Sequence, residues 1–425
     1  MNKITTSLMV IAIGFISTLI SLNANAVPAF ARQTNMACSA CHNSNFLALN
    51  SFGRQFKMQG YVLTTRSTVH KDASKAHPEQ LSISELPGLN AMMQISTTQT
   101  RVGVSGQQNG AIRFPQQLSL FLAGRISDKM GMFSQFTYAN GDSGFAIDNT
   151  DFRYADNTMI NGKSLFYGFT LDNNPTVGDL WNSTPAWGFP YSGSDVTVGP
   201  AAGDFISSLG GAVAGTGAYG MFDNHFYGKF TLYRNTNING AAGNTNVISG
   251  VAPYWRLAYQ TDLSGGYLMV GTYGISANVR PLAMATNTGI GGPLGKYTDT
   301  AIDFQYEHYM SNDNSLVMHG SYTHESRTDV DANGAYLANN KSTWKFSKFD
   351  MEYNLRGQWR PGVSVFSTNT GADNLDSAGY AVDVSYFPWE NVQLQALYTG
   401  YTKFDGSSNQ AGNNNSVYLL LWIVL

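Results

Sequence analysis

The chain has 425 residues, of which 12% are charged and 13% are aromatic, whereas about 25% of the residues in a typical soluble domain are charged. The formal net charge is −3, which offers no basic field for a polyanion and excludes nucleic acid as a main partner. The sequence contains no HExxH motif and no Walker loop, so hydrolytic and nucleotide chemistry have no support.

Residues 1–26 have the pattern of an export signal peptide. Lys3 supplies the initial positive charge, residues 8–22 form an apolar core, and residues 24–26 (Ala-Asn-Ala) form a small-x-small cleavage site. The apolar core is shorter than the roughly 20 residues that span a bilayer, so cleavage is favoured over a retained anchor. We expect an exported protein whose mature chain begins at Val27.

The motif Cys-Ser-Ala-Cys-His at residues 38–42 is the attachment motif of c-type haem. Two thiols at this spacing add across the two vinyl groups of haem, and the adjacent imidazole takes one axial position on the iron. A CxxC disulfide or redox dithiol is the alternative, but it needs no adjacent histidine. The motif predicts one covalently attached haem c, with Cys38 and Cys41 as thioether sites and His42 as the proximal iron ligand.

Met58 is the predicted distal iron ligand, because thioether ligation raises the haem potential and Met36 lies too close to the attachment site. His70 and His77 are the imidazole alternatives, although a solvated loop histidine is the more common explanation for each. Met58 also fits a plain core contact.

Residues 27–88 are expected to form a monohaem cytochrome c segment. Its compact part, residues 30–61, is too small to bury a haem alone, since chains below about 40 residues rarely build a sufficient core. Another part of the protein must therefore cover the haem. A barrel of sixteen strands has a lumen wide enough to do so, and we expect the segment to plug it.

Residues 89–425 alternate apolar and polar side chains with a period of two, as half-buried β-strands do. Ile302, Phe304 and Tyr306, for example, alternate with polar neighbours. No apolar run after residue 22 approaches the 18 residues of a membrane helix. If the mature protein crosses a membrane, it must therefore do so with strands. About sixteen runs begin near residues 91, 117, 131, 150, 163, 213, 225, 253, 266, 299, 314, 343, 363, 378, 391 and 416.

Short and long connections alternate along this region. Turn-rich links such as residues 128–130 and 388–390 follow longer ones such as 100–116 and 172–212. Outer-membrane barrels have short periplasmic turns and long extracellular loops, whereas a soluble sandwich or propeller does not need the low charge and the export signal found here. The sequence predicts an all-β fold, a transmembrane antiparallel β-barrel of about sixteen strands in the outer membrane, with residues 172–212 extracellular.

The last segment, Val417–Leu425, is apolar at all nine positions. Its length matches one membrane-spanning strand. Because it has no polar face, we expect its inner side to press against an apolar group in the lumen instead of lining a water channel.

Several stretches of the chain resemble the fused outer-membrane monohaem cytochrome–porin of iron-oxidising bacteria. They are Pro28–Thr34, Cys38–His42, Leu49–Tyr61, Asn173–Tyr191, Phe387–Asn391 and Asn413–Trp422. The resemblance covers essentially the whole mature chain. It implies a porin-like barrel with one c-type haem, in which Cys38 and Cys41 are the thioether sites and His42 is the proximal ligand.

The resemblance also implies oxidation of extracellular ferrous iron, with the electron passed to a periplasmic c-type cytochrome or a similar acceptor. Two alternatives stay open: an electron conduit for another donor or acceptor, and a diffusion porin in which the haem segment is a structural plug. Ferrous iron prefers carboxylate and imidazole ligands, so Asp303, Glu307 and His319 are candidates for iron contact, although polar lumen residues need no special function.

Overall fold

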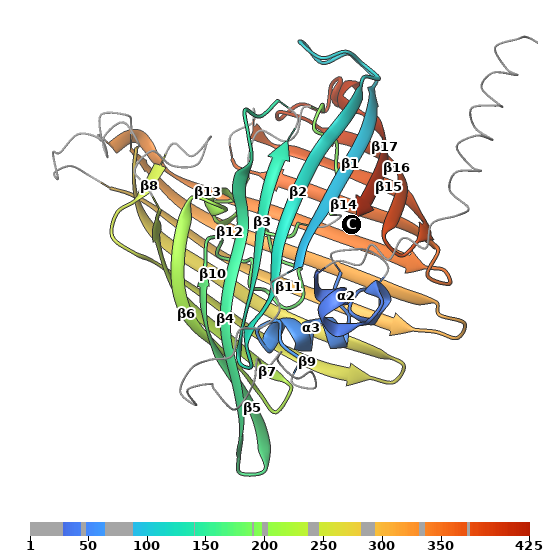
Figure 1. The fold of residues 1–425 in the computed structure, drawn as a ribbon. Coiled ribbons are helices and arrows are strands. Elements are labelled where there is room, and N and C mark those ends of the chain that lie inside the picture. Colours follow the sequence, from blue (N-terminus) through green and yellow to red (C-terminus); the bar gives the residue numbers. More distant parts are fainter. Residues whose placement is uncertain are drawn as a thin grey trace, which may run out of the picture.

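The computed structural model describes residues 29–43, 48–63, 88–139, 141–188, 191–197, 203–236, 246–281, 294–330, 336–371 and 375–425. His70 and His77 lie outside these ranges. Within them, a haem-motif segment of two short helices is followed by one large β-sheet (Figure 1).

The described strands form a closed antiparallel barrel. β1 pairs with both β2 and β17, which joins the two edges of the sheet. The three-residue β8 pairs with β10 beyond the end of β9. β8 and β9 therefore share one strand position, and the barrel has sixteen strand positions. This confirms the predicted fold and strand number.

The strands run over the following residues: β1 Gly88–Thr100, β2 Ile112–Ser127, β3 Met130–Ala139, β4 Ala146–Ile160, β5 Lys163–Asp172, β6 Val213–Phe222, β7 Phe226–Asn235, β8 Asn246–Ile248, β9 Ala252–Leu263, β10 Gly266–Pro281, β11 Gly295–Tyr309, β12 Ser315–Val330, β13 Tyr336–Asn354, β14 Trp359–Asn369, β15 Ser377–Trp389, β16 Val392–Lys403 and β17 Ser416–Val424.

Alternation along the strands separates a polar interior from an apolar exterior. Asp303 and Asp383 are buried inside the barrel, whereas their neighbours Ile302 and Val382 are about half exposed on the outside. An apolar outer face on a closed sheet is what a bilayer accommodates, because no strand edge is left unpaired. The protein is a transmembrane barrel of the outer membrane. None of the described helices is long and apolar enough to cross a membrane.

The connections sort onto two ends of the barrel. β4 and β5 are joined through Asn161 and Gly162, both with positive φ, and β15 and β16 are joined through Glu390 and Asn391. Such short turns, with the start of β1 and the end of β17, mark the periplasmic end. Two helices, α2 (Ala29–Thr34) and α3 (Ser51–Met58), lie at this end (Figure 1).

The connection between β5 and β6 departs from expectation. It leaves the extracellular end, as predicted, but then folds back into the lumen instead of lying outside. Val177, Leu180 and Trp181 in it are at most 1% exposed, and the Ser183 hydroxyl donates to the Asp303 carboxylate on β11 at 2.5 Å. We call residues 173–188 and 191–197 the inward segment. Buried polar partners on the barrel wall explain its course, and sequence spacing does not reveal them.

Candidate functional site

Helix α3 carries the haem-motif segment into the lumen. The Asn50 side chain accepts a hydrogen bond from the Gly53 backbone at 3.0 Å and begins the helix as an N-cap. Arg54 forms a buried ion pair with Glu307 on β11 and lies over the Tyr267 ring at 4.0 Å. One turn later, Lys57 Nζ donates to Asn182 of the inward segment at 2.8 Å. The helix is therefore fixed to both the wall and the inward segment.

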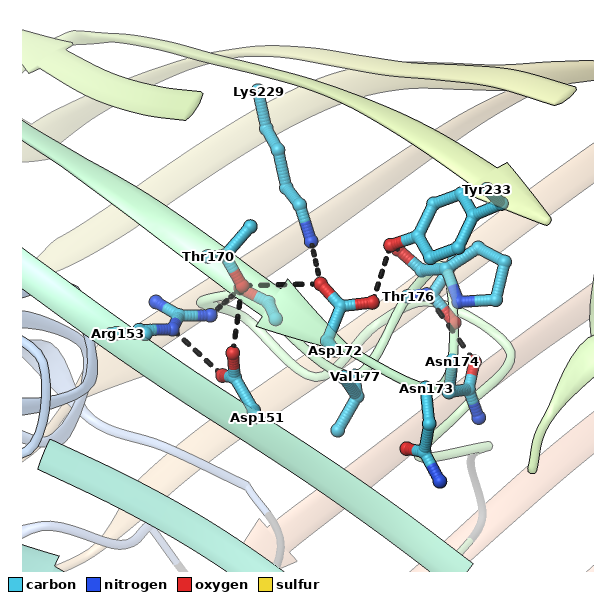
Figure 2. A network of polar contacts seen from close by, with 12 residues as sticks. Asp151, Arg153, Thr170, Asp172, Asn173, Asn174, Thr176, Val177, Lys229 and Tyr233 are labelled. Carbon is cyan, nitrogen blue, oxygen red and sulfur yellow. Dashed lines mark hydrogen bonds and ion pairs between the residues drawn. The ribbon is translucent and has the colours of Figure 1, made fainter. Parts of the chain in front are cut away.

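A second set of polar contacts joins the same three parts of the molecule, and Figure 2 shows its centre on the wall, Arg153 with Asp151. Arg153 on β4 donates to the Asp151 carboxylate at 2.7 Å, to the Lys57 carbonyl at 3.0 Å and to the Gly178 carbonyl at 2.6 Å. Tyr61, just after α3, donates to Asp151 at 2.6 Å. Because the Arg153 guanidinium bonds wall, helix and inward segment together, these parts hold one another in place.

The adjacent carboxylate of Asp172 extends this network along the wall (Figure 2). Lys229 on β7 donates to it at 2.9 Å and Tyr233 at 2.5 Å. The Thr170 hydroxyl lies within hydrogen-bond distance of both Asp151 and Asp172, at 2.9 and 3.1 Å. Every charged side chain in this network is buried and has a partner, so the network holds the wall rigid.

The CxxCH motif forms a tight turn beside α3. The backbone amides of Cys41 and His42 donate to the Cys38 carbonyl at 3.1 and 2.9 Å. Glu390, in the periplasmic turn between β15 and β16, accepts from the Cys38 backbone at 2.9 Å and from the Ser39 hydroxyl at 3.2 Å. A Cβ at Gly53 would lie 2.2 Å from the Cys41 carbonyl oxygen. Only glycine at position 53 lets α3 pack this closely on the motif.

Burial sets the protonation of the three motif side chains. It raises the pKa of both thiols, that of Cys41 to about 11, and lowers the pKa of His42 to about 4. The two cysteines are not bonded to each other. Redox CxxC motifs have lowered thiol pKa values, so this setting is unlike theirs. A neutral imidazole is the form that binds iron, and His42 Nδ1 is buried without a hydrogen-bond partner among the described residues.

A cavity of about 420 Å³ opens beside the motif in the periplasmic half of the lumen. Cys38, Cys41 and His42 line one side of it. The inner wall of five neighbouring strands, β17, β1, β2, β3 and β4, lines the other side, and it carries a group of apolar side chains beside the polar ones that are usual in barrel interiors. The apolar wall side chains are Trp422, Val424, Met92, Phe121, Ala123 and Phe133, and the polar ones are Asn90, Gln94, Gln117, Gln135, Asp148 and Asn149. The inward segment adds Asn182, Ala186, Trp187 and Tyr191.

These residues fit a c-type haem. The thiols and the imidazole of the attachment motif face one cavity whose volume is in the range of cofactor sites. Part of its far wall is apolar, as the faces of a macrocycle require. The predicted apolar contact of the last strand is met by Trp422 and Val424, which line this cavity.

Met58 lies elsewhere. Its side chain is 3% exposed and belongs to an apolar cluster with Leu180 and Trp181 of the inward segment and Tyr219 and Met269 of the wall. The structure therefore does not bring Met58 to the cavity that Cys38, Cys41 and His42 line. The position matches the plain core contact that the sequence left open.

The three candidates for iron contact are buried in the lumen, and each has polar partners. Asp303 accepts two hydrogen bonds from Arg256 at 2.9 and 2.8 Å, and Glu307 is paired with Arg54. His319 lies 3.4 Å from the Tyr191 hydroxyl and 3.3 Å from an Asp350 oxygen. The described residues contain no group of three or more His, Cys, Asp or Glu side chains that could hold a metal ion.

A second cavity of about 520 Å³ lies in the extracellular half of the lumen. Hydroxyl-bearing side chains such as Ser321, Thr323 and Thr399 dominate its lining, with Asp204 and Lys348 as charged groups. The inward segment contributes to the lining of both cavities. Its Ser183 and Ser192 face the extracellular cavity, and its Trp187 and Tyr191 face the haem-motif cavity.

Sequence reasoning did not find the inner-wall residues or the aromatic side chains of the inward segment as parts of the site. The unbroken apolar run at the end of the chain was a signal for Trp422 and Val424. Nothing in the local sequence pairs Trp187 with Phe133, whose rings are 5.8 Å apart, because that contact depends on the inward course of the loop.

Solved structures of outer-membrane proteins resemble this fold. They include OmpF of Salmonella typhi in complex with daunomycin (13% identity, TM-score 0.49, covering 80% of this chain and 97% of that chain) and the outer membrane channel DcaP of Acinetobacter baumannii (12%, 0.46, 80% and 96%). A mutant Rh. blastica porin is a third (12%, 0.40, 80% and 99%). No protein-family model and no curated protein sequence matches the chain.

Proposed function

We propose that this barrel is an outer-membrane cytochrome that takes electrons from extracellular ferrous iron and passes them to a periplasmic c-type cytochrome or similar acceptor. Cys38 and Cys41 hold one haem c, and His42 is its proximal ligand. When bound, the haem supplies a one-electron carrier: ferrous iron outside becomes ferric, and the electron leaves to the periplasm. The observation that carries the proposal is the cavity in which the attachment motif faces a group of apolar side chains on the barrel wall.

The position of the motif supports electron exit on the periplasmic side. Cys38 and Ser39 bond to Glu390 in a periplasmic turn, so the attachment site lies near the surface that a periplasmic partner reaches. Electron transfer needs proximity rather than a covalent path, and a site at the rim of the lumen provides it.

The arrangement of the two cavities supports electron entry from outside. The hydroxyl-lined cavity is in the extracellular half, and the inward segment lines both it and the haem-motif cavity. A small hydrated electron donor in the hydroxyl-lined cavity would be separated from the haem-motif cavity by the thickness of the inward segment. The aromatic side chains of that segment, Trp187 and Tyr191, exclude water from the haem side.

The full-length protein, matured in a host that attaches c-type haem, tests the proposal. We expect haem staining on a denaturing gel, loss of the stain in Cys38→Ser/Cys41→Ser, and reduction of the ferric haem by anaerobic Fe(II), with one Fe(III) formed per haem. Absence of covalent haem would refute the proposal. A haem that ascorbate reduces but excess Fe(II) does not would refute iron oxidation and leave a conduit for another donor.

A diffusion porin with a structural haem plug is the second candidate. The two lumen cavities favour it, since together they leave open volume on both sides of the inward segment. In planar bilayers this candidate predicts stable single channels and flux of small solutes, whereas the cytochrome predicts little conductance. The polar network that fixes the inward segment across the lumen supports the cytochrome.

A further inference from the structure

We infer that Met92, on the barrel wall, is the distal ligand of the haem. The inference rests on the proposed function and assigns the second axial position to the membrane barrel instead of the haem-motif segment. The haem would then be held by His42 from the plug on one face and by a thioether of β1 on the other.

The first observation is placement. Met92 faces the lumen and is 7% exposed. It lines the same cavity as Cys38, Cys41 and His42, and it is the only methionine among the described residues that line that cavity. Its partner in the β1–β17 ladder is Val424, and with Trp422 it belongs to one apolar cluster. Met58, on the plug itself, packs into a different cluster.

The second observation is that the other side chains with ligand atoms in this cavity have polar partners. Tyr61 donates to Asp151 at 2.6 Å, and Lys57 donates to Asn182 at 2.8 Å while lying 4.6 Å from the centre of the Trp187 ring. Tyr191 lies 3.4 Å from His319 Nε2. The Asp148 carboxylate accepts from Thr137 at 3.1 Å. Using any of these on iron would break a contact that holds the lumen together.

The third observation is chemical. Between Asn90 and Gln94 on the inner face of β1, Met92 packs with Trp422, Phe121 and Val424 of the neighbouring strands in an apolar cluster that suits a soft, neutral sulfur. Thioether ligation raises the haem potential relative to a second imidazole. A raised potential is what a haem needs if ferrous iron is to reduce it, so the assignment agrees with the proposed donor.

The experiment compares Met92→Leu with the matched variant Met58→Leu in the full-length, haem-loaded protein. Each removes one sulfur and keeps an apolar side chain of similar size. We expect Met92→Leu to keep its haem stain, to lose the far-red absorption band of thioether-ligated ferric haem, to bind added imidazole more tightly and to have a lower potential. We expect Met58→Leu to keep the band and the potential. Heat-dependent gel migration shows whether each barrel has folded.

Met92→His covers the case in which the leucine variant does not fold. It should give a six-coordinate, bis-imidazole spectrum with a lower potential. The inference is overturned if Met58→Leu loses the band, if Met92→Leu keeps it, or if the wild-type protein has no such band, which would point to Lys57 or a tyrosine. The proposed function fails separately, through a wild-type protein without covalent haem or with a haem that Fe(II) does not reduce.

Discussion

Arg54 of α3 and Glu307 of β11 form an ion pair inside the lumen, between residues that are 253 positions apart in the chain. Both side chains are at most 5% exposed. Glu307 also accepts from Gln305 and Tyr309 on its own strand. The carboxylate is therefore a docking point for the plug, which explains its burial without any role in iron binding.

Glu307→Gln is expected to loosen the plug, because it leaves the Arg54 guanidinium buried without its counter-charge. Breaking a buried pair from one side costs about 3–5 kcal/mol. Urea titration, followed by haem absorbance in the loaded protein, should show the haem-motif segment undocking at lower urea while the barrel keeps its gel migration.

The double variant Arg54→Met/Glu307→Gln is the informative control for this pair. Removing both charges should restore much of the lost urea resistance. The exposed pair Lys129–Asp156 at a periplasmic turn provides the second control, and Asp156→Asn should leave the midpoint unchanged. Equal loss in the single and double variants would argue against a buried-charge penalty.

Gly53→Ala is expected to impair haem attachment. The added methyl would lie 2.2 Å from the Cys41 carbonyl oxygen, and neither backbone can yield without moving the thiols away from α3. Overpacking of this kind costs about 1–3 kcal/mol or more. Haem stain per barrel, measured on gels, should fall. Gly103→Ala, where nothing lies within 4 Å, should keep the wild-type ratio, and an unchanged ratio in Gly53→Ala would show that the motif does not need this packing.

Much of the fold could be predicted from period-two alternation. All sixteen strand positions begin within seven residues of the predicted starts, and the largest difference is at β13, which starts at Tyr336 instead of near 343. Each strand has the polar lumen on one side and the apolar bilayer on the other, so the alternation of polar and apolar residues begins and ends with the strand. The inward course of the inward segment was not predictable, since it depends on single contacts such as that of Ser183 with Asp303.

The site divides in the same way. The attachment motif is local, so its residues are found from five positions of sequence. The distal side is not local: Met58 lies between Lys57 and Gln59, Met92 lies between Ala91 and Met93, and nothing in the sequence tells which of the two methionines faces the cavity. The pairing of β1 with β17, which closes the barrel, places Met92 beside Val424. Both side chains line the haem-motif cavity.

Protease access should follow the barrel ends. A cleavage site inserted at Gly106, in the exposed link between β1 and β2, should be cut in whole cells, and one inserted at Gly162, between β4 and β5, only after the outer membrane is permeabilised. Native Trp181 should resist chymotrypsin in both cases because it is fully buried in the lumen. Cutting at Gly162 in intact cells would invert the topology, and ready cleavage at Trp181 would contradict the inward fold of its segment.

Trp187→Ala is expected to open the partition between the two cavities. The indole donates to the Val177 carbonyl at 3.0 Å, packs on Phe133 and lies under Lys57, so alanine leaves a gap of the size of an indole at the point where the haem side is shielded. Water and small ions should then reach the haem from the extracellular half. We expect faster cyanide binding to the ferric haem and a higher bilayer conductance, with haem content unchanged.

Trp344→Ala on β13, a tryptophan that contacts Arg327 and lines neither cavity, should change neither measurement. If Trp187→Ala also leaves both unchanged, the inward segment is not the barrier between the cavities, and the path of the electron through the lumen must be sought along another wall.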